Sequence, residues 1–132
     1  MAPDTPRARV LVVDDEPDLV RILEFALRGA GYQVEIAADG QEGLKKARES
    51  RPDIILLDLM LPKIDGYKIC RMLKFDERYR HIPIIILSAR TQEGDQSLAI
   101  EMGANLFVTK PYEFEEILGH IESLLRAAAR TT

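Results

Sequence analysis

The stretch Ile54-Ile55-Leu56-Leu57-Asp58 decides the fold, because four consecutive apolar residues end directly at a carboxylate. A run that is apolar at every position predicts an interior strand of a parallel sheet, covered by helices on both faces. Three further apolar runs also end at polar residues: residues 10–13 before Asp14 and Asp15, residues 84–87 before Ser88, and residues 106–108 before Lys110. We therefore expect several buried parallel strands with polar residues at their carboxyl ends.

Amphipathic segments alternate with these runs, and the alternation predicts βαβ units. Apolar residues recur at helical spacing over about residues 17–28, 39–50, 67–75 and 92–102, and a last helix carries an apolar face between Phe114 and Leu125. We expect Ile22 and Met72 to face inward with the other apolar residues of their helices. The fourth helix should be the loosest, because Gly94 interrupts it.

The strand patterns also predict the order of the sheet. Residues 33–36 alternate between polar and apolar side chains, which is typical of a half-exposed edge strand, whereas the other early runs are continuously apolar. The prediction is a doubly wound α/β fold of the flavodoxin-like kind, with five parallel strands in the order 2-1-3-4-5 and five flanking helices. Ligands of such sheets bind at the carboxyl ends of the strands, so Asp14, Asp15 and Asp58 should meet at one crevice.

The composition fits one cytoplasmic domain. The 132 residues are 46% apolar and have a net charge of −4, which argues against a domain built chiefly to bind nucleic acid or an anionic membrane. No segment has a signal-peptide or membrane-spanning pattern. Cys70, the single cysteine, is expected to be a small buried residue. We expect a flexible N-terminus over residues 1–7, the folded domain over 8–126 and a C-terminal tail over 127–132.

The acidic residues of the crevice favour a metal ion. Two carboxylates about 4 Å apart repel each other by roughly 4 kcal/mol at an effective dielectric constant of about 20, so Asp14, Asp15 and Asp58 need a compensating cation. A site with only oxygen ligands, including a main-chain carbonyl after Asp58, favours Mg²⁺. Helix capping is the alternative role for Asp14 and Asp15.

Lys110 and Ser88 add an ammonium and a hydroxyl to the same site. Neither helps to bind a cation, but both could stabilise the oxygens of a phosphoryl group. No glycine-rich phosphate loop occurs, which argues against a nucleoside triphosphatase. A carboxylate can itself be the nucleophile, and Asp58 is the candidate because it stands alone at a central strand end.

These segments resemble the receiver domain of two-component response regulators. The segments that carry the resemblance are Val10-Leu11-Val12-Val13-Asp14-Asp15-Glu16, residues 53–62, Asp65-Gly66, Leu87-Ser88-Ala89 and Val108-Thr109-Lys110-Pro111. The resemblance covers almost the whole chain, and it implies a phosphorylation-dependent switch that assists its own phosphorylation and dephosphorylation but is not otherwise an enzyme.

The resemblance implies a role for each site residue. Asp58 would be the phosphoacceptor. Asp15, Asp58 and the main-chain carbonyl of Met60 would bind Mg²⁺ directly, and Asp14 would reach the ion through water. The remaining matches are a switch hydroxyl at Ser88, a lysine at Lys110 that pairs with the acyl phosphate, an aromatic switch position at Phe107, and a proline at Pro111 whose preceding peptide is typically cis.

The implied partner is a sensor histidine kinase or a phosphotransfer protein, and a small phosphodonor could also charge Asp58. Output would pass through the fourth and fifth helices, to an output domain, a partner or a second copy of the chain. Two alternatives remain: a phosphohydrolase with an aspartyl-phosphate intermediate, and a degenerate module that binds its partner constitutively. The chain departs from the usual pattern at Met60, which cannot position water, and at Arg90, which could lie over the phosphoryl group.

Overall fold

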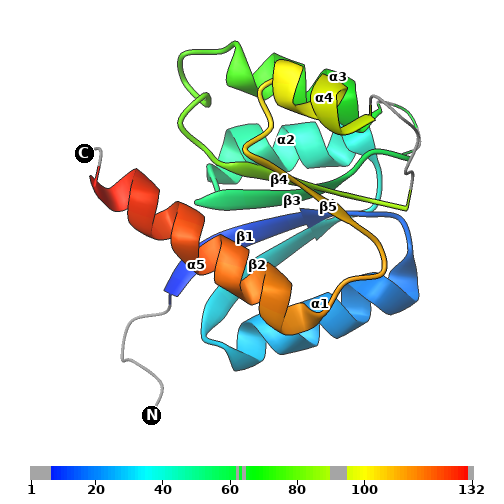
Figure 1. The fold of residues 1–132 in the computed structure, drawn as a ribbon, viewed down its shortest axis with the longest axis vertical. Helices are drawn as coiled ribbons and strands as arrows, with labels where there is room; N and C mark the ends of the chain where they lie inside the picture. The colour runs from blue at the N-terminus through cyan, green and yellow to red at the C-terminus, as the bar shows by residue number, and fades with distance from the viewer. Residues whose placement is uncertain (1–6, 62, 64, 90–94, 131–132) are drawn as a thin grey trace.

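The computed structural model describes residues 7–61, 63, 65–89 and 95–130. Strands and helices alternate along the chain (Figure 1), and their bounds are β1 (Arg7–Val13), α1 (Pro17–Gly29), β2 (Tyr32–Ala37), α2 (Gly40–Ser50), β3 (Ile54–Asp58), α3 (Gly66–Lys74), β4 (Ile84–Ser88), α4 (Asp95–Glu101), β5 (Leu106–Thr109) and α5 (Phe114–Arg130). The strands form one parallel sheet in the order β2-β1-β3-β4-β5. The predicted architecture and strand order are confirmed.

The burial of the strands matches their place in the sheet. Every residue of β3 and β4 is buried, as expected for interior strands with helices on both faces. In β2, the exposed Gln33 lies between the buried Tyr32 and Val34, so this strand keeps the alternation of an edge strand. The residue pattern therefore sets the strand order, and the order brings β1 and β3 together in the middle of the sheet.

Helices cover both faces of the sheet and enclose two apolar clusters (Figure 1). Above the sheet in this view, α2, α3 and α4 pack on one cluster, to which β1 contributes Leu11 and Val13. Below it, α1 and α5 pack on the other cluster, to which β1 contributes Val10 and Val12. Cys70 is free and buried in the first cluster, as predicted. None of the helices within the described ranges has the length and apolar character that crossing a bilayer requires.

Local signals place the starts of three helices. Pro17 is the first residue of α1, where its missing N–H is not needed. The side chain of Asp39 accepts a hydrogen bond of 2.8 Å from the main-chain N–H of Glu42, which confirms the predicted cap of α2. Asp65 caps α3 through a 2.9 Å bond from the N–H of Lys68, so this helix begins one residue earlier than predicted.

The prediction that Ile22 and Met72 face inward is wrong. Ile22 is 65% exposed and Met72 is 38% exposed. In α1 the buried residues are Val20, Leu23 and Leu27, a stripe with the spacing of one helix face, and Ile22 lies outside it. The apolar pattern gave the period of each helix but not which neighbouring apolar residue faces the sheet.

The two C-terminal helices also differ from expectation. The described part of α4 begins at Asp95, so Gly94 and the expected start near residue 92 lie outside the described residues. In contrast, α5 continues to Arg130, and residues 127–130 are helical where we expected the start of a tail. The acidic first turn of α5 and its run of helix-forming residues favour this long helix.

Candidate functional site at the carboxyl ends of the strands

Four predicted site residues meet where the strands end, at the right of Figure 1. Asp58 and Ser88 are the last residues of β3 and β4, Asp14 follows β1, and Lys110 follows β5. Asp14, Asp58 and Ser88 are buried, with 3%, 4% and 0% of their surface exposed. Buried carboxylates need partners, so their neighbours determine what this site can do.

Lys110 is the cation at the centre of this site. Its Nζ donates hydrogen bonds to Oδ2 of Asp14 at 2.9 Å and to Oε1 of Glu16 at 2.8 Å. The same Nζ lies 3.6 Å from Oδ2 of Asp58. The main chain fixes the position of Lys110, because its N–H donates to the carbonyl oxygen of Ser88 at 2.8 Å. One ammonium therefore neutralises part of the charge of three carboxylates.

The main chain also holds the two buried carboxylates. Oδ1 of Asp14 accepts a hydrogen bond of 3.0 Å from the N–H of Glu16, and Oδ1 of Asp58 accepts one of 3.2 Å from the N–H of Met60. Asp14 does not provide the N-terminal cap of α1, since the cap residue is Glu16 and its side chain makes no capping bond. Each buried carboxylate thus directs its other oxygen toward the ammonium of Lys110.

Carboxylate oxygens gather closely enough for a metal ion. Within the described part of the chain, one oxygen each of Asp14, Glu16 and Asp58 lie within 4.8 Å of one another. Hard oxygen donors of this kind suit Mg²⁺ or a similar cation, so the residues fit the ion that the sequence implied. Glu16 was missed as a site residue, because its approach depends on the turn after β1. Asp15, the expected direct ligand, is exposed and lies outside this group of three.

The charge of Asp15 nevertheless acts on the Asp58 carboxyl. Burial raises the pKa of the Asp58 carboxyl above its ordinary value, and the negative charges of Asp14 and Asp15 raise it further. The hydrogen bond from Met60 and the charge of Lys110 act in the opposite direction. Burial lowers the pKa of Lys110, but hydrogen bonds to Glu16 and Asp14 outweigh it, so the net pKa is raised and the ammonium remains charged. The net effect favours the neutral form of the Asp58 carboxyl more than in a free aspartate, chiefly because of burial.

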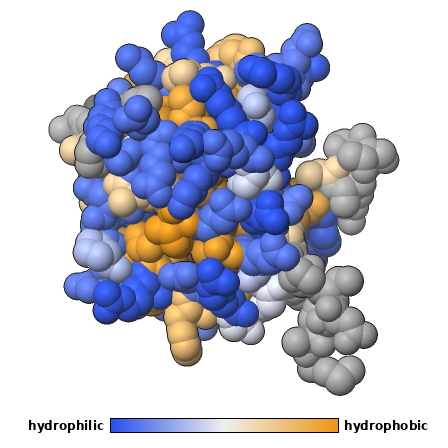
Figure 2. Space-filling model, turned by 180° about the vertical axis from the view of Figure 1, so that it is seen from behind, coloured by the Kyte–Doolittle hydropathy of each residue, from blue (hydrophilic) through white to orange (hydrophobic). Residues whose placement is uncertain are grey.

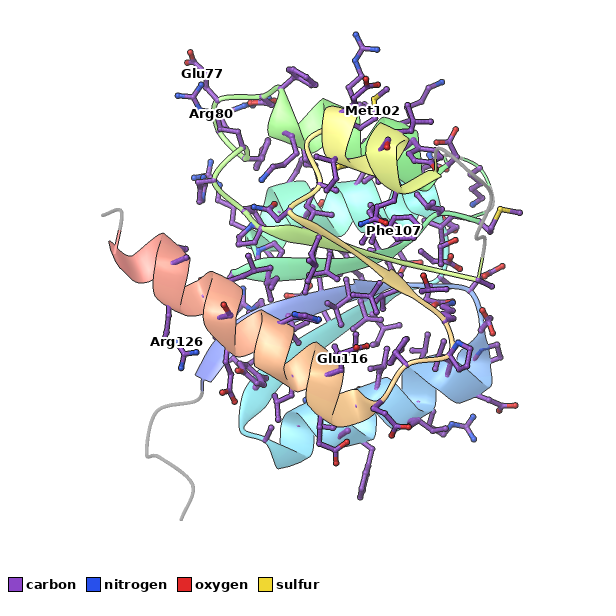
Figure 3. The ribbon with its side chains drawn as sticks, in the orientation of Figure 1. Glu77, Arg80, Met102, Phe107, Glu116 and Arg126 are labelled. Carbon is purple, nitrogen blue, oxygen red and sulfur yellow. The ribbon has the colours of Figure 1, made fainter. Side chains whose placement is uncertain are left out.

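The two predicted switch residues lie on neighbouring strands. Ser88 pairs with Thr109 in the register of β4 and β5, and Phe107 pairs with Ile86. Phe107 is partly buried against the cluster beneath α2, α3 and α4, and Figure 3 shows it on the side of β5 toward α4. The peptide bond between Lys110 and Pro111 is cis, as the resemblance implied.

The surroundings of the acidic site are partly open. Met60 is 56% exposed, and Arg90 lies outside the described residues. A cavity of about 360 Å³ next to Lys110 is lined by Glu16, Leu19, Ala89, Pro111 and Tyr112. Burial raises the pKa of Tyr112 to about 12, and its buried hydroxyl has no hydrogen-bond partner among the described residues. The cavity thus lies on the Lys110 side of the acidic site.

The sequence matches a known family over most of its length. The family model of the response regulator receiver domain matches residues 10–122. The chain belongs to this family. Receiver domains of this family are phosphorylation-dependent switches of two-component systems, and the fold and acidic site described above agree with that role.

Curated proteins and solved structures support the assignment. The receiver domain is 42% identical to the DNA-binding response regulator MtrA of Mycolicibacterium smegmatis, over 93% of this chain and 53% of that protein. It is 42% identical to the alkaline phosphatase synthesis transcriptional regulatory protein PhoP of Bacillus subtilis, over 89% of this chain and 48% of that protein. The chain thus spans about half the length of these curated relatives.

Two solved structures have the same fold. A putative response regulator from Chloroflexus aurantiacus is 34% identical, with a TM-score of 0.86 and coverage of 92% of this chain and 99% of that chain. The receiver domain of the sensor histidine kinase PA1611 from Pseudomonas aeruginosa is 33% identical, with a TM-score of 0.82 and coverage of 89% and 97%. That structure has a magnesium ion coordinated in its active site cleft.

Proposed function

We propose that Asp58 is the phosphoacceptor of this receiver domain. The observation that carries the proposal is the position of its carboxylate, which is buried at the end of a central strand and lies 3.6 Å from the ammonium of Lys110. In the transfer, a carboxylate oxygen of Asp58 forms the new bond to phosphorus. The bond from phosphorus to the donor breaks at the same centre, and the donor leaves with the electron pair.

The residues around Asp58 would together stabilise the negative charge on the phosphoryl group. Lys110 would pair with an oxygen of the phosphoryl group, and the hydroxyl of Ser88 would bind another. Asp14, Asp15 and Asp58 would hold Mg²⁺ together with the main-chain carbonyl of Met60. When bound, the ion would supply positive charge to the developing phosphoryl oxygens and reduce the repulsion among the carboxylates.

Phosphorylation would shift the balance between two conformations. Ser88 moves toward the phosphoryl group, and the ring of Phe107, which already packs on the α4 side of the sheet, moves further inward. The affected surface is formed by α4, β5 and α5.

A sensor histidine kinase or a phosphotransfer protein is the proposed donor. An output domain, a separate partner or a second copy of the chain would bind the α4 and α5 surface. The curated relatives named above include a DNA-binding and a transcriptional regulator, so control of transcription in the cytoplasm is the output we favour. The receiver domain itself would be a signalling module and not an enzyme in its own right.

The direct test is phosphorylation by a small phosphodonor with Mg²⁺, followed by intact mass measurement. We expect one added phosphoryl group in the parent and none in Asp58→Asn. Asp53→Asn is the matched control, because Asp53 is exposed and lies outside the site. No addition to the parent would point to a degenerate module. Continuous release of phosphate from many donor molecules at a high rate would point to a phosphohydrolase.

A further inference from the structure

Lys110 lies closer to two other carboxylates than to Asp58. Its Nζ is 2.8 Å from Glu16 and 2.9 Å from Asp14, against 3.6 Å from Asp58. Two of the three N–H donors of the ammonium are engaged by Glu16 and Asp14, so the third can reach a phosphoryl oxygen on Asp58, and any movement of Nζ toward Asp58 to shorten that contact lengthens the other two. The identity of the contact that yields determines how readily the phosphorylated state forms.

Asp14 cannot follow or release the ammonium easily. Its side chain is buried, and its other oxygen is held by the N–H of Glu16 at 3.0 Å. Glu16 differs, because its side chain is 58% exposed and its carboxylate makes no other hydrogen bond in the described structure. An exposed carboxylate can exchange a weak ion pair for water at little cost. The contact between Glu16 and Lys110 is therefore the one that can open.

We propose that Glu16 is a positioning residue that holds the ammonium of Lys110 in the unphosphorylated state and competes with the phosphoryl group for it. This inference rests on the proposed function of Asp58. Phosphorylation transfers Lys110 from Glu16 to the phosphoryl oxygen, while the contact to Asp14 keeps the side chain in the site. Glu16 then favours the unphosphorylated conformation by the strength of one half-exposed ion pair.

The geometry allows a competing role, in which Glu16 is a metal ligand, because its carboxylate is one of the three that lie within 4.8 Å of one another. The two roles predict that Glu16→Gln changes the binding of two different ligands. Removal of a competitor strengthens binding of a phosphoryl analogue, whereas removal of a ligand weakens binding of Mg²⁺ by tenfold or more. Measuring both quantities separates the roles.

The probe is beryllofluoride, a phosphoryl analogue, titrated at saturating Mg²⁺ and followed by ¹⁹F NMR. We expect Glu16→Gln to bind it about two- to fivefold more tightly than the parent, which corresponds to an exposed ion pair. Mg²⁺ affinity, titrated alone, should change by less than about threefold, the size of a weak surface charge effect. Asp18→Asn is the matched control, because it removes one exposed acidic charge from the first turn of α1 without touching Lys110.

A double-mutant cycle identifies the contact. In Lys110→Gln, the added change Glu16→Gln should leave beryllofluoride affinity unaltered, since the ammonium over which the groups compete is gone. The inference is overturned if Glu16→Gln matches Asp18→Asn, if its effect persists without Lys110, or if Mg²⁺ affinity falls tenfold. If the parent itself fails to bind beryllofluoride, the proposed function fails as well, and that outcome is distinct from a lack of difference between the variants.

Discussion

The Nζ atom of Lys110 lies 2.9 Å from Oδ2 of Asp14, a residue 96 positions earlier in the chain. These residues follow β5 and β1, which are separated by β3 and β4 in the sheet. The lysine side chain therefore reaches across the carboxyl ends of two intervening strands, and its Nζ also lies 3.6 Å from Oδ2 of Asp58 at the end of β3. The contact therefore connects the segment after β1 with the segment after β5 across the functional site.

Replacement of Lys110 by Gln should destabilise the fold in the absence of Mg²⁺. The change leaves the buried carboxylates of Asp14 and Asp58 without their ammonium, and we expect the free energy of unfolding to fall by roughly 2–4 kcal/mol. Added Mg²⁺ should reduce this deficit, because the ion compensates the same charges. Urea denaturation with and without Mg²⁺ measures both effects.

Lys63→Gln is the control for this measurement. Lys63 forms an exposed ion pair with Asp39 at 3.3 Å, and loss of such a pair changes stability by about 1 kcal/mol or less. If Lys110→Gln is no more destabilising than Lys63→Gln, the ammonium is not an important partner of the buried carboxylates.

Asp58→Asn should stabilise the Mg²⁺-free protein at neutral pH. Burial raises the pKa of Asp58 in the folded state, so its ionised form disfavours folding. The gain should grow as pH rises from the unfolded-state value, which is near 3.8, through the raised folded-state pKa, and then stay constant. We expect about 1 kcal/mol at pH 7.5, measured by urea denaturation across this pH range. A gain that is the same below pH 3.8 as at pH 7.5 would contradict the raised folded-state pKa of Asp58.

Met60→Asn should shorten the lifetime of the phosphorylated form. Met60 is exposed beside Asp58, and its thioether cannot hold a water molecule for attack on phosphorus. An amide there could orient such a water, and we expect roughly three- to tenfold faster loss of the phosphoryl group. Decay of the phosphorylated protein, followed by intact mass after removal of the donor, measures the rate. An unchanged rate in Met60→Asn would show that residue 60 does not limit hydrolysis.

Arg28 and Lys46 protect the open edge of the sheet. Arg28 donates to the carbonyl of Val34 at 3.0 Å, and Lys46 donates to the carbonyl of Ile36, both on β2. An apolar strip lies between polar layers on the molecular face seen from behind, the β2 side (Figure 2). Open edges of this kind pair with other strands unless charged groups block them. The double variant Arg28→Met with Lys46→Met should therefore self-associate with rising concentration in sedimentation velocity.

The matched control for this edge is Arg21→Met with Lys45→Met. These residues are exposed on the same two helices, and the change removes the same charge without touching the β2 carbonyls. Self-association of both double variants would assign the effect to charge alone and not to the blocked edge.

Patterns of apolar residues were sufficient to predict the sheet. The continuous runs and the alternation at residues 33–36 placed β2 at the edge and β1 inside it, which in turn brought Asp14 and Asp58 to one crevice. The capping-box residues of α2 were also readable, since a cap depends on residues three positions apart.

Side-chain contacts that depend on turns were not predictable. Glu16 reaches Lys110 only because of the path of the chain between β1 and α1, which no residue pattern reveals. Ile22 and Met72 are exposed because neighbouring apolar residues can each belong to a helical stripe, and packing selects one of them. The structure therefore adds the partners of each charge to a site whose location the sequence already indicated.

Localisation of the modified residue tests the central claim most directly. The protein is phosphorylated with a small phosphodonor and Mg²⁺, the acyl phosphate is reduced with borohydride, and peptides are sequenced by mass spectrometry. The account predicts that reduction converts Asp58 alone to homoserine, and that the conversion requires Mg²⁺. Homoserine at Asp14 or Asp15, or modification that is independent of Mg²⁺, would contradict it.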